Sequence, residues 1–291
     1  MNSYTDLFIK SGKSKYGDDA EKLFFNAAQG SRDPQESCIA YLKSDNSYYM
    51  TGGLNGDTSV KNQTRYSYSP VHQEAAVCCV PNAGRIAPYY IQNMWVKNGN
   101  NMVAALLGPC TVNTILNGKK ISIKEKTNYP YGYTIDFEIL ADNATFGLRI
   151  RKPSWVKKFS VSENFTEENG FIIINKKWNG KTIIKIQFFP EVKVAQDING
   201  ENYFTYGALV LAHPIVSIAD TTKTFSLPGF YNLKYSPKDL VIYKYSQKAV
   251  TQTDKEKLLF KTFLISPVTK QEEEVTLKPM GQTILRQVTF K

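Results

Sequence analysis

The sequence predicts a mixed, mainly β protein in which a short helical part precedes a long β-rich part. Residues 1–101 contain two segments with helical periodicity, whereas residues 102–291 contain no convincing helix. After residue 102, short runs of alternating apolar and polar residues are separated by turn dipeptides at the spacing typical of a β-sandwich. The 18 tyrosines and 16 phenylalanines agree with a large β content.

These patterns divide the chain into three parts. Residues 1–101 form the helical part, residues 102–216 a β-sandwich domain, and residues 217–291 a β-rich segment that completes or extends the sandwich. Two helices cannot bury their apolar faces alone. The helical part therefore needs the sandwich, or helices from outside this sequence, to cover it.

The first helical region spans residues 1–30. Leu23, Phe24 and Ala27 form an apolar face, and Gly30 is suited to end the helix. Residues 31–68 lose this periodicity, with short strand-like pieces at 39–42 and 48–51. An irregular segment of this length in a compact chain is often functional.

A second helix is expected over residues 81–96. Pro81 suits a first helical turn. Ile86, Tyr90 and Met94 then follow along one side of the helix.

The β-rich part shows strand faces and turns. Ile135, Phe137 and Ile139 share one face of a strand, as alternation with period two requires. Strands are expected at 119–124, 134–139, 145–150, 171–174, 184–188, 203–212, 240–245, 258–264 and 283–290. Turns are expected at Asn117-Gly118, Asn179-Gly180 and Asn199-Gly200, and the acidic run 272–274 on a solvated loop or edge.

Composition excludes several classes. The net charge is +10, but the basic residues are scattered among acids without a recognised nucleic-acid-binding module, so we expect no nucleic-acid partner. No apolar run approaches the ~20 residues of a membrane span, so we expect no membrane partner. The N-terminus lacks the segments of a signal peptide, and the compartment stays open. Four cysteines in 291 residues do not make a disulfide framework.

Cys78 and Cys79 are the most informative pair. Adjacent thiols pair with difficulty, because their disulfide closes a strained ring. They lie just before the second helix, where the positive end of the helix dipole favours thiolate, the form that attacks carbon and binds zinc. Buried, purely structural cysteines are the alternative reading, and the residues alone leave both open.

Other candidate ligands surround this pair. His72 and Glu74 are interpreted as loop or supporting groups, and the triplet Glu36-Ser37-Cys38 as a weak candidate for ligands. His213 is expected to be structural. The tryptophans can stack on sugars or pack in the core, and both readings stay open for Trp95, Trp155 and Trp178.

The sequence resembles a known family, glycoside hydrolase family 127, which contains the β-L-arabinofuranosidases. The most specific match is the Cys-Cys-x-x-Asn element at residues 78–82, and it is followed by a helix that runs to Trp95. Weaker matches fall in the right order along nearly the whole chain: residues 21–27 (EKLFFNA), 127–130 (TNYP), 148–155 (LRIRKPSW), 178–180 (WNG), 206–210 (YGALV) and 277–283 (LKPMGQT).

The resemblance implies a fold and a chemistry. The fold is an incomplete C-terminal part of an (α/α)6 toroid, residues 1–101, followed by β-sandwich domains. By resemblance, Cys78 is the catalytic nucleophile, Cys78 and Cys79 are zinc ligands, and a separate glutamate is the acid/base. The reaction is retaining hydrolysis of β-L-arabinofuranosyl or related linkages in plant-type glycans.

The sequence also departs from the family. The acid/base glutamate and the Glu-x-Cys ligand pair of the family lie upstream of the helix at residues 18–29, and no counterpart is present there. Glu36-Ser37-Cys38 follows that helix and is therefore rejected as the ligand pair. We expect an inactive or weakly active portion whose missing helices come from a separate chain. The alternative is a non-catalytic β-sandwich module that binds carbohydrate or packs on a partner.

Overall fold

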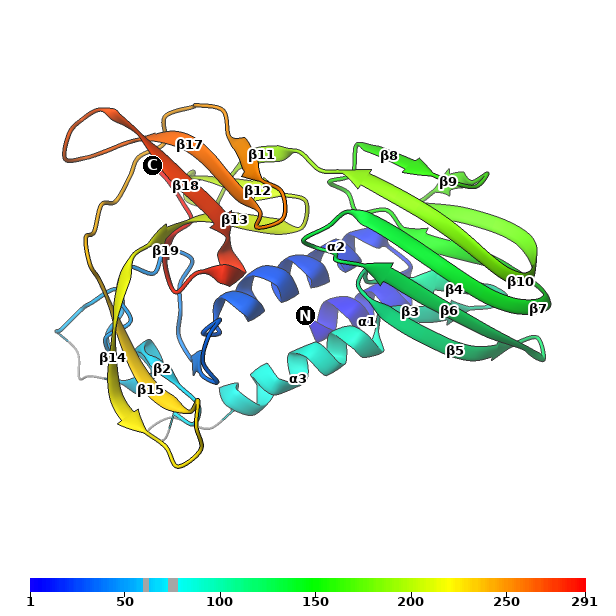
Figure 1. The fold of residues 1–291 in the computed structure, drawn as a ribbon, viewed down its shortest axis with the longest axis horizontal. Coiled ribbons are helices and arrows are strands. Elements are labelled where there is room, and N and C mark those ends of the chain that lie inside the picture. The colour runs from blue at the N-terminus through cyan, green and yellow to red at the C-terminus, as the bar shows by residue number, and fades with distance from the viewer. Residues whose placement is uncertain (60–62, 73–77) are drawn as a thin grey trace. The chain divides into compact units, whose positions relative to one another are not determined.

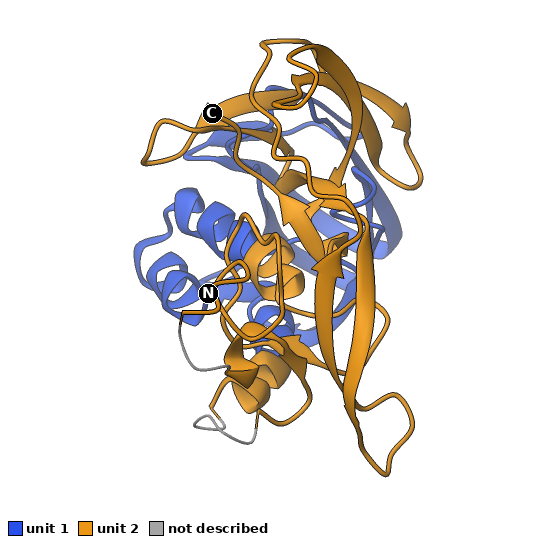
Figure 2. Cartoon of the chain, turned by 90° about the vertical axis from the view of Figure 1, so that its left-hand side faces the viewer, with its two compact units in different colours: residues 1–23, 86–191 blue, residues 24–85, 192–291 orange. Residues whose placement is uncertain are grey.

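The computed structural model describes residues 1–59, 63–72 and 78–291 (Figure 1). The chain packs into two compact units that alternate along the sequence (Figure 2). Unit 1 contains residues 1–23 and 86–191, and unit 2 contains residues 24–85 and 192–291. The domain boundaries expected after residues 101 and 216 stay a prediction. In the ranges described, no helix is both long and apolar enough to cross a bilayer.

The N-terminal region is helical, as predicted. Helix α1 spans Asn2–Ser11 and ends at Gly12, whose left-handed conformation (φ 66°) lets its N–H cap the carbonyl of Phe8. Helix α2 spans Ser14–Lys22 and continues into a π-helical turn, Leu23–Ala28.

Helix α3 differs from its predicted bounds. It spans Cys79–Gln92, so it starts two residues earlier and ends four residues earlier than the predicted 81–96. Trp95 and Val96 are instead in strand β3, because the backbone there pairs with strand β4 rather than continuing the helix. Pro88 is accommodated inside α3.

Unit 1 contains an eight-stranded sheet whose main path is β3-β4-β7-β10-β8. Strands β5 and β6 continue it on one side of β7, and β9 pairs with β10. The bounds are β3 Trp95–Asn98, β4 Asn101–Ala104, β5 Cys110–Leu116, β6 Lys119–Thr127, β7 Thr134–Arg151, β8 Lys158–Val161, β9 Thr166–Glu168 and β10 Phe171–Phe189. The mainly β character predicted for the chain is confirmed.

Two pairs of predicted strands are fused in this sheet. The predicted strands at 134–139 and 145–150 are parts of β7, and those at 171–174 and 184–188 are parts of β10. The turn predicted at Asn179-Gly180 is wrong: the register of β10 against β7 shifts between Trp178 and Gly180, which marks a bulge. Gly180 has φ 66°, a conformation that suits glycine in a bulge as well as in a turn.

The inward faces of these strands follow the predicted alternation. Ile135, Phe137 and Ile139 are fully buried. Trp178 is also buried, stacks on Phe146 and donates its indole N–H to the Phe146 carbonyl at 3.0 Å. The sheet therefore buries one face in the core of unit 1, and its other face carries exposed side chains.

Unit 2 contains two sheets. The four-stranded one has the order β1-β2-β15-β14, and the seven-stranded one has the order β11-β12-β13-β18-β17-β16 with β19 beside β13. The bounds are β1 Ile39–Ala40, β2 Tyr68–Ser69, β11 Val192–Gln196, β12 Asn202–Tyr206, β13 Leu209–Ile215, β14 Ser217–Thr224, β15 Tyr231–Pro237, β16 Thr251–Asp254, β17 Leu259–Ile265, β18 Glu272–Pro279 and β19 Leu285–Gln287, with short 3₁₀ turns at Thr64–Tyr66 and Met280–Gln282.

Two local predictions in unit 2 are wrong. Residues 48–51 and 240–245 form only isolated bridges, at Met50 and Lys244. The acidic run 272–274 begins strand β18, where it pairs with β17 and is mostly exposed, in keeping with the expected solvated edge. Its outward carboxylates are balanced there by lysines, with Lys261 Nζ 2.6 Å from Glu274 and Lys248 Nζ 3.2 Å from Glu272.

Candidate catalytic centre at the cysteine pair

The cysteine pair lies at the start of α3. Cys78 immediately precedes the helix and is exposed, whereas Cys79 is its first residue and is partly buried. Their sulfur atoms are 4.0 Å apart, far beyond the ~2.05 Å of a disulfide. Both thiols are free, and Cys78 is open to a ligand.

Tyr41 is the residue that acts most directly on Cys78. Its hydroxyl oxygen lies 3.2 Å from the Cys78 sulfur. Its ring meets the edge of the His72 ring, with the centroids 5.9 Å apart, and the Arg65 guanidinium lies 5.8 Å from its centroid. These contacts hold the hydroxyl in place.

His72 supports the ring of Tyr41. It is buried, and its Nε2 lies 2.8 Å from the Ile39 carbonyl oxygen. The hydrogen bond fixes the ring that Tyr41 packs against. Glu74 lies outside the described residues.

The two cysteines differ in acidity. The hydrogen bond from Tyr41 is the main cause that lowers the pKa of the Cys78 thiol. Burial is the main cause that raises the pKa of Cys79. The same hydrogen bond raises the pKa of Tyr41, so its hydroxyl stays a donor to the thiolate. Cys78 is therefore the better nucleophile of the pair.

The first turns of α3 are anchored within unit 2. The Arg32 guanidinium donates a 2.5 Å hydrogen bond to the Ala83 carbonyl oxygen. Beside it, Asp33 accepts the backbone N–H of Gln35 at 2.9 Å and the hydroxyl of Tyr235 at 2.6 Å. Arg32 and Asp33 line a pocket of about 310 Å³ that also includes Glu36, Cys38 and the Val80–Gly84 side of the helix.

The structure does not make Cys38 a ligand. Cys38 is buried in the core cluster that contains Met50 and Tyr68, and burial together with the nearby Asp33 and Glu36 raises its pKa to about 12. A thiol with so high a pKa is a poor source of thiolate. The burial of Cys38 agrees with the expectation that Glu36-Ser37-Cys38 is not the ligand pair.

A zinc site requires at least three protein ligands. Cys78 and Cys79 supply two sulfur donors 4.0 Å apart. Among the residues that the structure describes, no group of three His, Cys, Asp or Glu side chains is placed to hold a metal. The described residues thus do not fit a zinc ion by themselves, and we derive no catalytic step through one.

The remaining candidates are structural. His213 is partly buried in β13, with Nδ1 3.1 Å from the Thr276 carbonyl oxygen, and burial lowers its pKa. Trp178 is in the core, and Trp95 donates its N–H to the Cys110 sulfur at 3.2 Å. Trp155 packs edge-on against Tyr133 and Phe188. The core reading is therefore correct for Trp178, whereas Trp95 and Trp155 are partly exposed.

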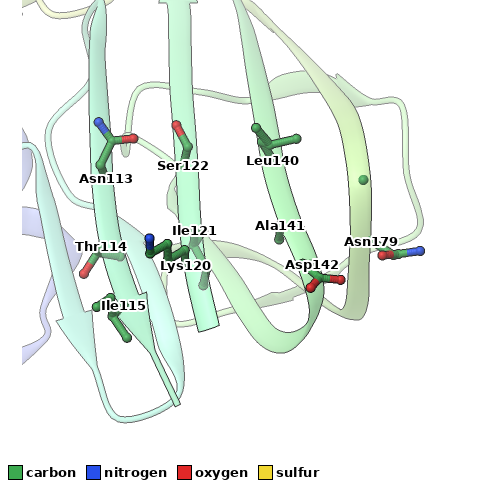
Figure 3. A pocket seen from close by; sticks show the side chains of 11 residues that line it. Asn113, Thr114, Ile115, Lys120, Ile121, Ser122, Leu140, Ala141, Asp142 and Asn179 are labelled. Carbon is green, nitrogen blue, oxygen red and sulfur yellow. The ribbon is translucent and has the colours of Figure 1, made fainter. Parts of the chain in front are cut away.

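A broad hollow of about 710 Å³ lies on the exposed face of the unit 1 sheet, beside the bulge between β7 and β10 (Figure 3). Asn113, Ser122 and Leu140 come from three neighbouring strands and are paired directly across the sheet. Asp142 and Asn179 lie near its other end (Figure 3). No cysteine, histidine or aromatic residue is among the described residues that line it, so these residues give the hollow neither a thiol nor an aromatic stacking surface.

Tyr41 was missed by the sequence reasoning. It lies 37 residues before Cys78, in a segment without regular periodicity, and no local motif marks it. The only sequence signal was general: an irregular segment of this length often carries function. Its role depends on a contact that only the fold creates.

We expect Tyr41→Phe to raise the pKa of the Cys78 thiol, because the thiolate loses its main hydrogen-bond donor. Alkylation of Cys78 by iodoacetamide at neutral pH should become several-fold slower, on the order of the thiolate fraction lost. Peptide mapping across a pH series measures this rate at Cys78 alone. Tyr66→Phe, which removes a hydroxyl elsewhere in unit 2, is the matched control, and an unchanged Tyr41→Phe profile would contradict the assignment.

One family model matches a part of the chain. Residues 101–189 match a family model described as the β-L-arabinofuranosidase, GH127 middle domain. The resemblance to glycoside hydrolase family 127 is confirmed. The matched residues contain most of the unit 1 sheet, from β4 to the end of β10. No curated protein matches the chain.

Solved GH127 structures share the fold of nearly the whole chain. A GH127 β-L-arabinofuranosidase from Geobacillus stearothermophilus T6 aligns over 97% of this chain and 46% of its own, with a TM-score of 0.66 and 15% identity. A second GH127 β-arabinofuranosidase aligns over 99% of this chain and 47% of its own, with a TM-score of 0.69 and 15% identity. The chain therefore spans about half the length of these GH127 structures.

Proposed function

We propose that this chain carries the nucleophile of a retaining GH127-type glycoside hydrolase that cleaves β-L-arabinofuranosyl linkages in plant-type glycans. The observation that carries the proposal is the exposed Cys78 thiol at the start of α3, with its pKa lowered by Tyr41. A family match over residues 101–189 and the shared GH127 fold support the same chemistry.

The reaction proceeds in two displacements. The Cys78 thiolate attacks the anomeric carbon, a carbon–sulfur bond forms, and the bond to the leaving oxygen breaks. The leaving oxygen takes a proton from an acid. Water then attacks the same carbon and gives its proton to the conjugate base of that acid, the carbon–sulfur bond breaks, and the thiolate is released with net retention. Tyr41 stabilises the thiolate before the first step and after the second.

Two parts of this proposal lie outside the described residues. A separate chain or segment supplies the acid. If Cys78 and Cys79 take part in a zinc site, the same source supplies the further zinc ligands. Zinc would supply charge to keep the thiolate deprotonated. No step above depends on it, and we expect the chain alone to be inactive or weak on natural substrates.

An activated substrate tests the nucleophile in this chain alone. A 2,4-dinitrophenyl β-L-arabinofuranoside has a leaving group that departs without a protonated acid, so the first displacement can proceed. We expect the intact protein to gain the mass of one pentosyl group, and peptide mapping should place it on Cys78. Cys78→Ala should gain none.

The α-anomer of the same glycoside is the matched control, and it should not label the protein. Labelling of another residue, or equal labelling of Cys78→Ala, would overturn the assignment of the nucleophile. The alternative function, a non-catalytic carbohydrate-binding module, predicts reversible sugar binding and no covalent adduct.

A further inference from the structure

Two arginines of β7 have the same orientation and very different surroundings. Arg149 and Arg151 are two residues apart on one strand, so their side chains point to the same face of the sheet. Arg151 is fully buried and forms ion pairs with Asp18 and Glu21. Its Nε also donates to the Ala105 carbonyl oxygen at 2.6 Å.

Arg149 has weaker ionic interactions than Arg151. The carboxylate paired with it is Glu168, at 3.9 Å from Nη2, and the Glu168 side chain is 63% exposed. An ion pair with so long a distance and so exposed a carboxylate contributes little to stability. The Arg149 Nε is buried and has no hydrogen-bond partner, although a buried polar atom without one is costly. The guanidinium is therefore available for an anionic ligand.

Arg149 lines a pocket of about 480 Å³ between α1 and the β3-β4 side of the sheet. Lys10, at the end of α1, and Lys97, in β3, line the same pocket. Among the described residues that line it, none is acidic. The carbonyl end of α1 is negative, but Lys10 and the Gly12 N–H bond to the Phe8 carbonyl offset it. The pocket is thus basic.

The rest of the lining fits a sugar better than a bare ion. Phe8 and Phe171 pack with ring centroids 6.1 Å apart, and the Arg149 guanidinium carbon lies 6.0 Å from the Phe171 centroid. Both rings belong to a buried core cluster, so they form the apolar floor of the pocket and hold the guanidinium in place. Ser11, Asn98 and Asn169 add polar groups that can bind hydroxyls.

We propose that this pocket binds the carboxylate of a uronate residue in an acidic glycan, with Arg149 as its anchor. The planar guanidinium can hold a carboxylate with two parallel hydrogen bonds, which Lys10 and Lys97 reinforce by charge. This site is independent of Cys78 and adds a glycan-binding function to the hydrolase proposed above.

Titration of the full chain with trigalacturonate, followed by calorimetry, tests the site. We expect binding that Arg149→Gln weakens by about tenfold or more, because it removes the charged, two-point contact. Lys97→Gln should weaken it several-fold by removing one charge. Lys120→Gln, an exposed lysine of β6 that does not line this pocket, is the matched control and should bind as the wild type does.

Two further probes separate a glycan site from a generic anion site. Galactotriose, which is neutral, should not bind, and inorganic phosphate should bind far more weakly than trigalacturonate. Phosphate binding as tight as trigalacturonate binding would overturn the glycan assignment. Wild-type affinity in both Arg149→Gln and Lys97→Gln would overturn the site itself.

Discussion

Arg151→Leu is expected to destabilise unit 1 by about 3–5 kcal/mol, the cost of breaking a buried ion pair by removing one partner. The substitution leaves Glu21, which is 1% exposed, as a buried charge without its cation. Glu21 also accepts the hydroxyl of Tyr129 at 2.6 Å and the backbone N–H of Leu107 at 3.0 Å. These donors remain after the substitution, but they do not neutralise the carboxylate.

Tryptophan fluorescence during urea unfolding measures this loss, because all three tryptophans lie in unit 1. Arg149→Leu is the matched control, since it makes the same change two residues away on the same face. We expect it to cost no more than about 1 kcal/mol, because Arg149 has only a long, exposed ion pair. Equal losses in the two variants would show that Arg151 acts through packing alone.

Glu125→Gln is expected to change how the stability of unit 1 depends on pH. Glu125 is buried, and burial raises the pKa of its carboxyl to about 8. Its Oε1 accepts the Gly108 N–H at 3.0 Å, and the Cys110 sulfur lies 3.8 Å from Oε2. The folded protein therefore holds a proton on Glu125 that the unfolded chain releases at lower pH.

The sign follows from the raised pKa. Stability from the protonated carboxyl is fully present below the unfolded value of 4.5 and is lost as the pH rises through about 8. The difference corresponds to a contribution of about 5 kcal/mol across this window, as an order of magnitude. Wild-type unit 1 should thus lose unfolding free energy between pH 5 and pH 8, roughly the window that these pKa values bracket.

Glutamine keeps a carbonyl acceptor for the Gly108 N–H and carries no titrating proton. The unfolding free energy of the Glu125→Gln variant should therefore not decrease over this pH window. The measurement is tryptophan fluorescence in urea at a series of pH values. Asp142→Asn, which changes an exposed acid of the same sheet, should keep the wild-type slope. A Glu125→Gln variant with that same slope would show that another group is responsible.

Local alternation explains which strand faces were predicted correctly. Ile135, Phe137 and Ile139 are spaced by two, and burial of one sheet face selects that spacing. The Asn179-Gly180 dipeptide was misread, because a glycine with positive φ serves a bulge as readily as a hairpin turn. Only the pairing of β10 with β7 along its whole length distinguishes the two.

The position of the cysteine pair could be read from the sequence, but its acidity could not. Pro81 and the periodicity after it place Cys78 beside a helix start, and the Cys-Cys-x-x-Asn element is the most specific part of the resemblance to glycoside hydrolase family 127. The donor that lowers the pKa of Cys78 is Tyr41, from a segment without periodicity. Likewise, Tyr129 reaches Glu21 across 108 residues of sequence.

The sequence alone determined the mainly β character and the inward faces of the strands. These properties depend on residues close together in the chain, whose spacing sets the periodicity of a helix or strand. The tertiary structure decided that Tyr41 contacts Cys78, that Cys38 is buried, and that Arg151 has two buried ion pairs while Arg149 has only a long, exposed one. Those properties depend on which distant segments the fold brings within hydrogen-bonding distance, and side-chain spacing along the chain does not encode that distance.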